Sequence, residues 1–336
     1  MKIYVHGRDH AGSSIETDRG NIINILKDMN HKIVDNYIFA DALHSVWWDR
    51  LLPMKYYPIR FKKRIIATAS NFIYPDENNN YKKLKKIVSL WIAPSKKQYD
   101  LLKRDGVNVE YVPFYVDSSI FKKENKSKKE LVEELGIDYK LIENKILFGS
   151  FQRDTWGKDL ITPKWQKNPE LLVNIFRNMP KKDGWLVMLA GPRRHYIIRE
   201  FEKYGIPYYY YGKKPEDGID DIQINNINPI KMNKLYNLID CYVVSSKLEG
   251  GPKSVIESSL CKTYILSTDV GLAPDILDKS CIANDEEGLK GRIIWFINNM
   301  KSDSIEHVRS DNLCRVNMLC SKETIMKSFK KIYEPI

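Results

Sequence analysis

Short apolar runs alternate with amphipathic, lysine-rich stretches along nearly the whole chain. Lys2 to Val5, Ser89 to Ala93 and Trp185 to Ala190 are examples of such runs. Apolar runs of this length, separated by helical stretches, are typical of parallel strands joined by crossover helices. We therefore expect an α/β fold. Further strands are expected over residues 31–38, 65–69, 109–112, 145–150, 241–245 and 264–267, and helices over 19–29, 96–105 and 322–333.

The length of the chain predicts two domains. A single hydrophobic core rarely grows to 336 residues, and two domains of roughly 150 residues each are the natural division. A polar, charge-dense stretch from Lys122 to Glu134 precedes the strand expected over 145–150. Because such stretches commonly separate domains, we expect a boundary near residue 138, with a first domain over 1–138 and a second over 139–318.

Composition limits the class of protein. The formal charge of +11, from 54 Lys and Arg against 43 Asp and Glu, suggests a phosphorylated substrate, anionic lipid or nucleic acid, although a generic lysine-rich surface explains it equally well. No apolar run reaches 18 residues, and MKIYVHGRDH lacks a secretory pattern, so a cytoplasmic location is expected. The five cysteines form no CxxC pair and are expected to be reduced thiols.

The segment from Ser245 to Leu277 carries the strongest functional signal. A strand is expected to end at Ser245 and to lead through Glu249 into the glycine pair 250–251, where the backbone can approach a ligand. Pro252 suits the first position of a helix, whose free amides and dipole favour an anion. Glu257 comes eight residues after Glu249, roughly 7–8 Å into that helix at about 1.5 Å per residue. This spacing fits a ligand with hydroxyls at both ends and phosphates between, such as a nucleotide sugar.

On these residues the chain resembles the retaining glycosyltransferase family 4, whose hallmark is two glutamates separated by seven residues. The resemblance implies the GT-B fold, with two Rossmann-like domains facing across a cleft and a C-terminal helix, residues 319–336, packing back on the first domain. It implies that Glu249 contacts the hydroxyls of the donor sugar and that Glu257 binds the ribose. The other donor-binding residues that it implies are Gly250, Gly251, Pro252, Lys253, Ser254 and Gly191.

The resemblance also implies that cationic side chains bind the diphosphate. Arg153 follows an expected strand, and the run Lys167-Asn168 stands where the family usually has Lys-Gly. Asn tolerates the unusual backbone angles that glycine adopts. Lys158 and Lys164 are alternatives to Lys167, which we favour. Cations are needed because negative charge builds on the leaving phosphate.

The acceptor side departs from the family. Many members place a histidine after the third strand, where this chain has Ala69-Ser70-Asn71-Phe72, so either Ser70 or Asn71 substitutes by hydrogen bonding or the role is absent; Asn71 is the candidate that we keep. The first loop, 6–14, contributes the candidates His10, Gly12 and Ser13, although a lone loop histidine is more often structural. The basic and aromatic segment 54–64 suits an anionic membrane, single-stranded nucleic acid or simply a buried aromatic cluster. No DxD triplet occurs, so we expect no metal and no cofactor.

The sequence therefore predicts a retaining, metal-independent glycosyltransferase. It would move a hexose-type sugar from a UDP- or GDP-linked donor to a glycan or lipid-linked acceptor, for surface polysaccharide or glycolipid synthesis, with no nucleic-acid partner. A nucleotide-sugar epimerase, a phosphorylase and a non-catalytic nucleotide-sugar-binding protein are the alternatives. A dinucleotide oxidoreductase is disfavoured because no GxGxxG follows the first strand.

Overall fold

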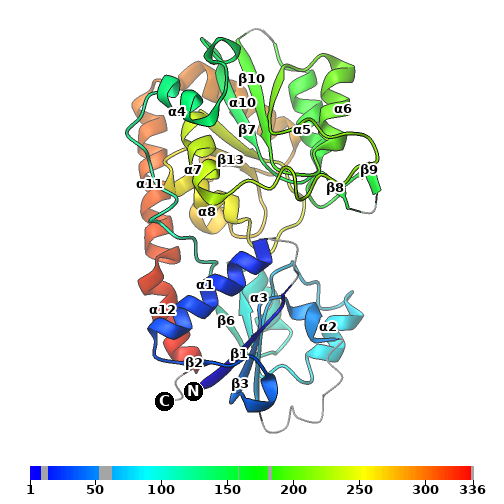
Figure 1. Ribbon diagram of the computed structural model, residues 1–336, viewed down its shortest axis with the longest axis vertical. Coiled ribbons are helices and arrows are strands. Elements are labelled where there is room, and N and C mark those ends of the chain that lie inside the picture. The colour runs from blue at the N-terminus through cyan, green and yellow to red at the C-terminus, as the bar shows by residue number, and fades with distance from the viewer. Residues whose placement is uncertain (9–13, 53–62, 158, 181–183, 334–336) are drawn as a thin grey trace. The chain divides into compact units, whose positions relative to one another are not determined.

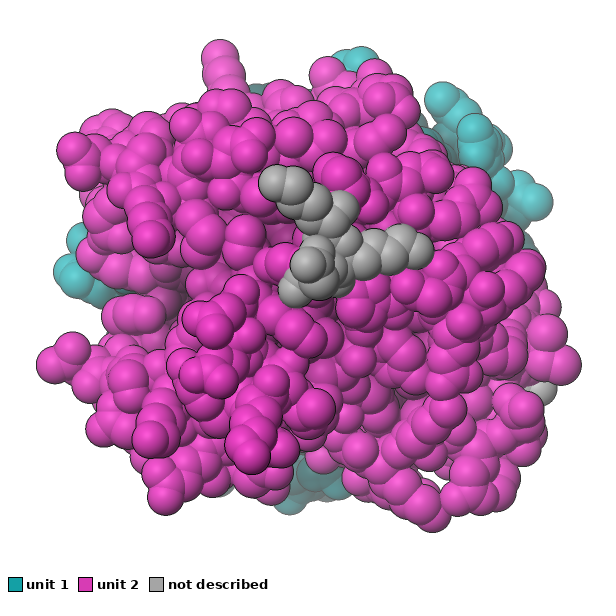
Figure 2. Space-filling view, turned by 90° about the horizontal axis from the view of Figure 1, so that it is seen from above, with its two compact units in different colours: residues 1–116, 249–253, 317–336 teal, residues 117–248, 254–316 magenta. Residues whose placement is uncertain are grey.

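The computed structural model describes residues 1–8, 14–52, 63–157, 159–180 and 184–333. Contacts between residues divide the chain into two compact units, coloured separately in Figure 2. Unit 1 comprises residues 1–116, 249–253 and 317–336, and unit 2 comprises residues 117–248 and 254–316. Each unit is built on one parallel sheet of six strands. The α/β class expected from the sequence is thus confirmed.

The sheet of unit 1 has the strand order β2-β1-β3-β4-β5-β6; β1, β2, β3 and β6 are labelled in Figure 1. Its strands are β1 (Lys2–His6), β2 (Lys32–Ile33), β3 (Ala42–Ser45), β4 (Arg64–Thr68), β5 (Leu90–Ala93) and β6 (Val109–Tyr111). Its connecting helices are α1 (Ser14–Asp28), α2 (Asn79–Leu84) and α3 (Lys96–Arg104), with short 3-10 turns at Tyr37–Phe39 and Trp48–Leu51. The parallel order places the carboxyl ends of all six strands at one edge.

The C-terminal helix α12 (Lys322–Tyr333) belongs to the core of unit 1. Its residues Ile325, Phe329 and Tyr333 are at most 3% exposed and pack in one apolar cluster with residues of β1, β4, β5 and α1. The amphipathic pattern of 322–333 therefore reflects a buried face. The expectation that the end of the chain packs on the first domain is confirmed.

Strand β3 was not expected from the sequence, and its last two residues, His44 and Ser45, are polar. His44 and Ser45 are both 0% exposed. The imidazole of His44 lies 2.9 Å from Thr68 Oγ1 through Nε2 and 2.6 Å from the Tyr333 hydroxyl through Nδ1. A buried polar group is tolerated when it is hydrogen-bonded. Of the strand expected over 31–38, only the two residues of β2, Lys32 and Ile33, form a strand.

The sheet of unit 2 has the order β11-β10-β7-β12-β13-β14. Its strands are β7 (Ile146–Ser150), β10 (Trp185–Ala190), β11 (Tyr208–Tyr211), β12 (Cys241–Val244), β13 (Tyr264–Thr268) and β14 (Ile282–Ala283). A separate antiparallel hairpin consists of β8 (Thr155–Trp156) and β9 (Asp159–Pro163). Its helices are α4 (Lys128–Leu135), α5 (Pro169–Arg177), α6 (His195–Tyr204), α7 (Pro229–Leu238), α8 (Lys253–Leu260), α9 (Ala273–Ile276), α10 (Glu286–Asn299) and α11 (Asp303–Cys320), with 3-10 turns at Tyr139–Leu141 and Lys279–Cys281. Helix α8 begins with Lys253 of unit 1, and α11 ends in unit 1 from residue 317 onward.

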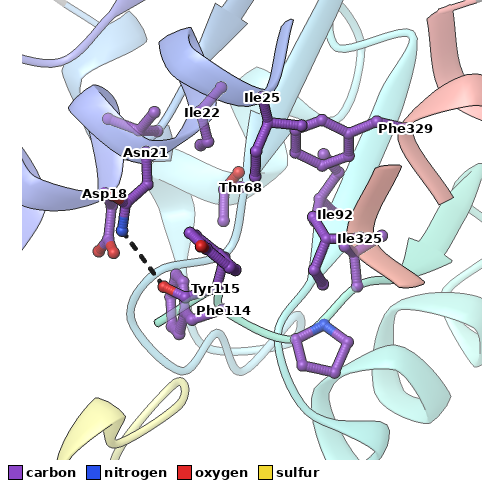
Figure 3. Close-up of a pocket in the computed structure, with 13 residues that line it drawn as sticks. Asp18, Asn21, Ile22, Ile25, Thr68, Ile92, Phe114, Tyr115, Ile325 and Phe329 are labelled. Carbon is purple, nitrogen blue, oxygen red and sulfur yellow. Dashed lines mark hydrogen bonds between the residues drawn. The ribbon is translucent and has the colours of Figure 1, made fainter. Parts of the chain in front are cut away.

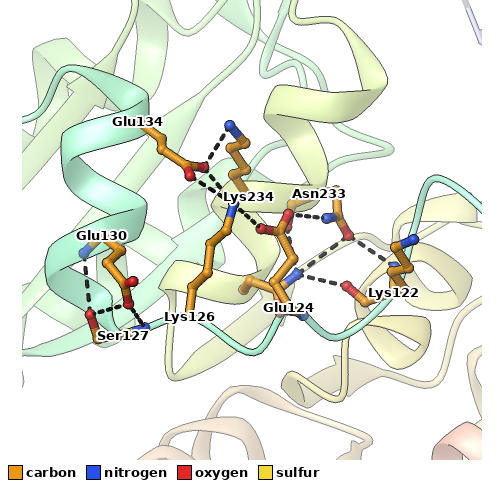
Figure 4. A network of polar contacts seen from close by, with 9 residues as sticks. Lys122, Glu124, Lys126, Ser127, Glu130, Glu134, Asn233 and Lys234 are labelled. Atoms are coloured by element: carbon orange, nitrogen blue, oxygen red, sulfur yellow. Dashed lines mark hydrogen bonds and ion pairs between the residues drawn. The ribbon is translucent and has the colours of Figure 1, made fainter.

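The charged stretch that follows unit 1 is fixed to helix α7. The backbone amides of Lys122 and Glu124 donate to the side-chain oxygens of Asn233 (2.9 Å) and Asn237 (2.8 Å), and the Asn233 amide donates to the Glu124 carboxylate at 2.6 Å (Figure 4). Lys126 pairs with Glu124 and, together with Lys234, with Glu134 of α4. The units consequently divide after residue 116, whereas the sequence suggested a boundary near residue 138.

No helix in the part of the chain that the structure describes is both long enough and apolar enough to span a bilayer.

Candidate functional site

Several loops of unit 2 converge at the carboxyl edge of its sheet. In open parallel sheets this edge is where ligands bind. The loops are those after β7 (151–154), before α5 (164–168), after β10 (191–194) and after β12 (245–248).

Side-chain and backbone hydrogen bonds join three of these loops. The hydroxyl of Ser246 donates to Gln152 Oε1 at 2.6 Å, and the hydroxyl of Ser245 donates to the carbonyl of Lys167 at 3.0 Å. The amide of Lys247 donates to the carbonyl of Gln166 at 2.8 Å. The structure thereby brings the loop that contains Arg153, the loop that contains Lys167 and the loop that leads to Glu249 into one network.

The start of helix α5 has the backbone geometry that the sequence suggested. Asn168 has a left-handed conformation with φ of 48° and is followed by Pro169 at the first helical position. Asn adopts such angles at little cost, and Pro has no amide to leave unsatisfied there. Lys167 is half-buried directly before this turn. The position next to a helix N-terminus suits a cation that helps to bind phosphate.

Arg153 stands beside a buried ion pair. Its neighbour Asp154 is 2% exposed and lies 3.4 Å from Nε of Arg194, which is 1% exposed. The Asp154 carboxylate also accepts the amides of Tyr196 (3.2 Å) and Ile197 (3.4 Å) in the first turn of α6. Burial raises the pKa of Asp154 and lowers that of Arg194, and the attraction between the two opposes both shifts. This pair fixes the backbone on which Arg153 is carried.

Gly191 lies at the end of β10 in a conformation that favours glycine, with φ of 83°. Its carbonyl accepts the Tyr210 hydroxyl at 2.9 Å. The next turn contains Arg193, whose guanidinium makes two bonds with Asp220 at 2.9 and 2.7 Å. Gly191 is thus a buried structural turn at the carboxyl edge, which is the place expected for a donor-binding glycine.

The long stretch between Arg153 and Lys167 forms the hairpin β8–β9. Arg199 of α6 holds it by donating to the carbonyls of Leu160 (3.2 Å) and Ile161 (2.9 Å). The ammonium of Lys164 lies 4.8 Å from the centroid of the Trp156 ring. Of the three candidate lysines, Lys158 lies outside the described residues, and Lys167 is the one whose carbonyl is bonded to the loop after β12.

Glu257 projects from helix α8 toward helix α7. Its Oε2 accepts a hydrogen bond of 2.9 Å from the hydroxyl of Tyr236, which is 2% exposed. Glu257 itself is half-buried. The hydroxyl fixes the orientation of the carboxylate.

The segment Glu249–Lys253 groups with unit 1, separately from Glu257. Lys253, which is expected to bind the donor, pairs with Asp18 of α1 at 2.7 Å. Burial raises the pKa of Asp18, and the Lys253 ammonium opposes that shift. A methyl group on Gly250 would collide with the carbonyl oxygen of Ser70, so only glycine fits there.

The structure also describes the remaining residues of this segment. Helix α8 begins at Lys253, so Pro252 directly precedes the helix rather than occupying its first position. Glu249, Gly251 and Ser254 are half-buried, and the carbonyl of Ser254 accepts the Ser258 hydroxyl at 2.5 Å.

The acceptor-side candidates are described only in part. His10, Gly12 and Ser13 lie outside the described residues, as does most of the basic and aromatic segment 54–64. Asn71 is exposed just beyond the carboxyl end of β4. Lys63 donates its ammonium to three backbone carbonyls between residues 37 and 40, at 2.5–2.7 Å, so this one cation of the segment has a structural role.

Two cavities help to delimit the site. At the carboxyl edge of unit 2, a cavity of about 750 Å³ includes Asn168, Ser246 and Lys247 among its lining residues. In unit 1, α1, residues 112–115 and α12 contribute to the lining of a mostly apolar cavity of about 30 Å³, at one side of which the amide of Asn21 donates to the Tyr115 carbonyl at 3.3 Å (Figure 3). The second volume holds little more than one water molecule, so it is no sugar site.

Sequence reasoning missed Gln152, Asp154, Arg194 and Ser246, which connect the loops. Asp154 and Arg194 are 40 residues apart, so no local pattern joins them. The only signal was the charge of Asp154 itself, directly after Arg153. Among the described residues, no group of three or more His, Cys, Asp and Glu side chains is placed to hold a metal ion.

Residues 163–306 match the family model described as "Glycosyl transferases group 1". No curated protein sequence matches the chain.

Solved structures of similar fold include Alr3699/HepE from Anabaena in complex with UDP-glucose, with a TM-score of 0.74, 12% identity and complete coverage of both chains. A glycosyltransferase from Rickettsia africae has a TM-score of 0.70 and 14% identity, with 99% of this chain and 97% of that chain covered. Sucrose-phosphate synthase from Thermosynechococcus elongatus has a TM-score of 0.64 and 13% identity, with 95% and 78% covered. The chain thus has the two-domain α/β fold of the GT-B glycosyltransferases, and most of the region that matches the group 1 model belongs to its second unit.

Proposed function

We propose that the chain is a retaining, metal-independent glycosyltransferase that moves a hexose-type sugar from a UDP- or GDP-linked donor to a glycan or lipid-linked acceptor. One observation carries the proposal: the loops with Arg153 and Lys167 are hydrogen-bonded to the loop that leads to Glu249, at the carboxyl edge of a parallel sheet. The match of residues 163–306 to group 1 glycosyl transferases supports it, as does the likeness to a protein solved with UDP-glucose.

Each residue has a role that its chemistry suits. Arg153 and Lys167 would neutralise the diphosphate, on which negative charge grows as the bond to the sugar breaks. Glu257, oriented by Tyr236, would accept hydrogen bonds from the ribose hydroxyls. Glu249 would accept hydrogen bonds from the hydroxyls of the donor sugar.

The proposed reaction needs no protein nucleophile. The bond between the anomeric carbon and the phosphate oxygen breaks, and the acceptor hydroxyl oxygen forms a new bond to that carbon from the same face. The proton of the hydroxyl passes to the departing phosphate oxygen. The anomeric configuration is retained, and a nucleoside diphosphate is released.

The proposal includes the surroundings in which the protein works. We place it in the cytoplasm, with peripheral contact to an anionic membrane through its basic first domain, and in surface polysaccharide or glycolipid synthesis. Neither a metal nor a nucleic-acid partner is part of the proposal, so transfer should persist in EDTA.

The test measures nucleotide binding and sugar release separately. UDP-glucose and GDP-mannose are incubated with the protein, with and without disaccharide acceptors, and the anomeric signals are followed by NMR. Glu249→Ala should abolish transfer while UDP or GDP still binds, and Arg153→Ala should lower turnover by about 100-fold. Glu216→Ala, at an exposed carboxylate of the same unit, is the control.

Three outcomes would overturn the proposal. Full transfer by Glu249→Ala would remove the sugar contact on which it depends. Conversion of the donor sugar without any acceptor would indicate an epimerase. Nucleotide binding without turnover on any acceptor would indicate a binding protein.

A further inference from the structure

A pocket in unit 1 lies beyond the carboxyl end of strand β4, and the site described above does not use it. Its volume is about 390 Å³. It is lined by Phe72, Tyr74, Glu77, Asn78, Asn79 and Asn80. In open parallel sheets the carboxyl edge is the usual place for ligands, so this pocket has a location that favours binding.

The aromatic wall of the pocket is held rigidly. Ile73 is 0% exposed, and the buried side chain of Gln98 accepts its amide at 2.6 Å and donates to its carbonyl at 3.2 Å. Because Ile73 points inward, its neighbours Phe72 and Tyr74 are turned toward the surface, with ring centroids 5.0 Å apart. Tyr74 is 45% exposed. Such preorganised, exposed aromatic surface lowers the cost of ordering a binding site.

The polar wall offers both donors and acceptors. Asn78 uses its side-chain oxygen to cap α2, accepting the amide of Tyr81 at 3.0 Å, which leaves its NH₂ group available. The side chains of Glu77, Asn79 and Asn80 make no hydrogen bond to any residue that the structure describes. Amides donate and accept, and a carboxylate accepts.

This combination fits a saccharide. A sugar ring presents apolar C–H faces, which pack on aromatic rings, and a rim of hydroxyls, which both donate and accept hydrogen bonds. The six lining residues contain one acid and no base. Nucleic acids and anionic lipid surfaces are bound through Lys and Arg, so the charge of this pocket disfavours both.

The pocket lies close to the segment expected to contact the donor sugar. Gly250, next to Glu249, packs directly on the carbonyl of Ser70, and all three residues belong to unit 1. Phe72 follows Ser70 by two residues, a separation of at most about 7 Å along the chain. We propose that this pocket binds a sugar unit of the acceptor, which makes the acceptor a neutral glycan; this rests on the function proposed above.

The binding test uses the full chain with lactose, cellobiose and N,N′-diacetylchitobiose as probes, measured by saturation-transfer NMR. At least one disaccharide should bind, and Tyr74→Ala and the pair Glu77→Gln with Asn79→Ala should each weaken it about fivefold to tenfold. Phe39→Ala is the matched control, because Phe39 is an aromatic residue of the same unit that is 67% exposed and precedes β3, at the opposite edge of the sheet. It should leave binding unchanged.

A second measurement separates this inference from the proposed function. UDP and GDP affinity, and slow hydrolysis of the donor by water, should be the same in Tyr74→Ala as in the unmodified protein. If neither nucleotide binds, the proposed function fails, whereas the disaccharide result still decides the pocket. Three results would overturn the inference. No disaccharide binds, or Phe39→Ala weakens binding as much as Tyr74→Ala does. The third is that Tyr74 is needed for binding to phosphatidylglycerol vesicles or single-stranded DNA and not to a disaccharide.

Discussion

Asp154 and Arg194 form an ion pair of 3.4 Å in which the side chains are only 2% and 1% exposed. The pair connects the loop after β7 to the loop after β10, and Arg194 also donates to the Ser150 hydroxyl at 3.2 Å. A buried charge is tolerated only when it is compensated. This ion pair therefore stabilises the carboxyl edge of unit 2, and removing either side chain alone would leave the other charge buried without compensation.

Asp154→Ala should lower the free energy of unfolding by about 3–5 kcal/mol, because it leaves the Arg194 charge buried without a partner. Asp220→Ala should cost no more than about 1 kcal/mol, since its pair with Arg193 is partly exposed to solvent. Urea denaturation measures both. The double variant Asp154→Ala with Arg194→Met should cost less than the sum of its single changes, and simple additivity would argue against this account.

The stability of the protein should fall as the pH is lowered below about 6.5, partly through His44. Burial lowers the pKa of His44 to about 3, so between that pH and the ordinary value near 6.5 the unfolded chain binds a proton that the folded chain does not. In this window the free energy of unfolding should decline by up to about 1.4 kcal/mol per pH unit from this residue.

Denaturation curves of His44→Gln and the unmodified protein at pH 7 and pH 5 measure this contribution. The variant is less stable at pH 7, because it disturbs the bonds to Thr68 and Tyr333, but its stability should change less with pH. His307→Gln, whose side chain is 77% exposed, should keep the pH dependence of the unmodified protein. An unchanged slope in His44→Gln would contradict the prediction.

Tyr236→Phe should weaken the binding of UDP or GDP about threefold to tenfold, because it removes the hydroxyl that orients Glu257 and costs about one hydrogen bond. Isothermal titration calorimetry measures the affinity. Tyr208→Phe removes a similar bond, the 2.8 Å contact with Glu202 at the surface of the same unit, and should leave the affinity unchanged. Equal effects of the two changes would show that Glu257 does not contact the nucleotide.

Local patterns in the sequence were enough to predict a large part of the architecture. The apolar runs at 2–5, 89–93 and 185–190 all form strands, because a buried parallel strand needs little more than a short apolar run between turns. The period of 322–333 likewise predicted helix α12, and Asn168 has the unusual backbone angles that Asn was expected to tolerate. These features depend on residues that are neighbours along the chain.

Contacts between distant residues decided the rest. His44 is in a strand because Thr68 and Tyr333 satisfy its ring, and the stretch 122–134 packs on α7 because Asn233 and Asn237 accept its amides. The partners of Asp154 and Lys253 are likewise far away in sequence. The sequence alone determined which residues could be buried and which segments could be helices or strands. Only the folded chain determined which polar groups meet, since a buried polar group is stable wherever a partner is in reach, however far apart the two are in sequence.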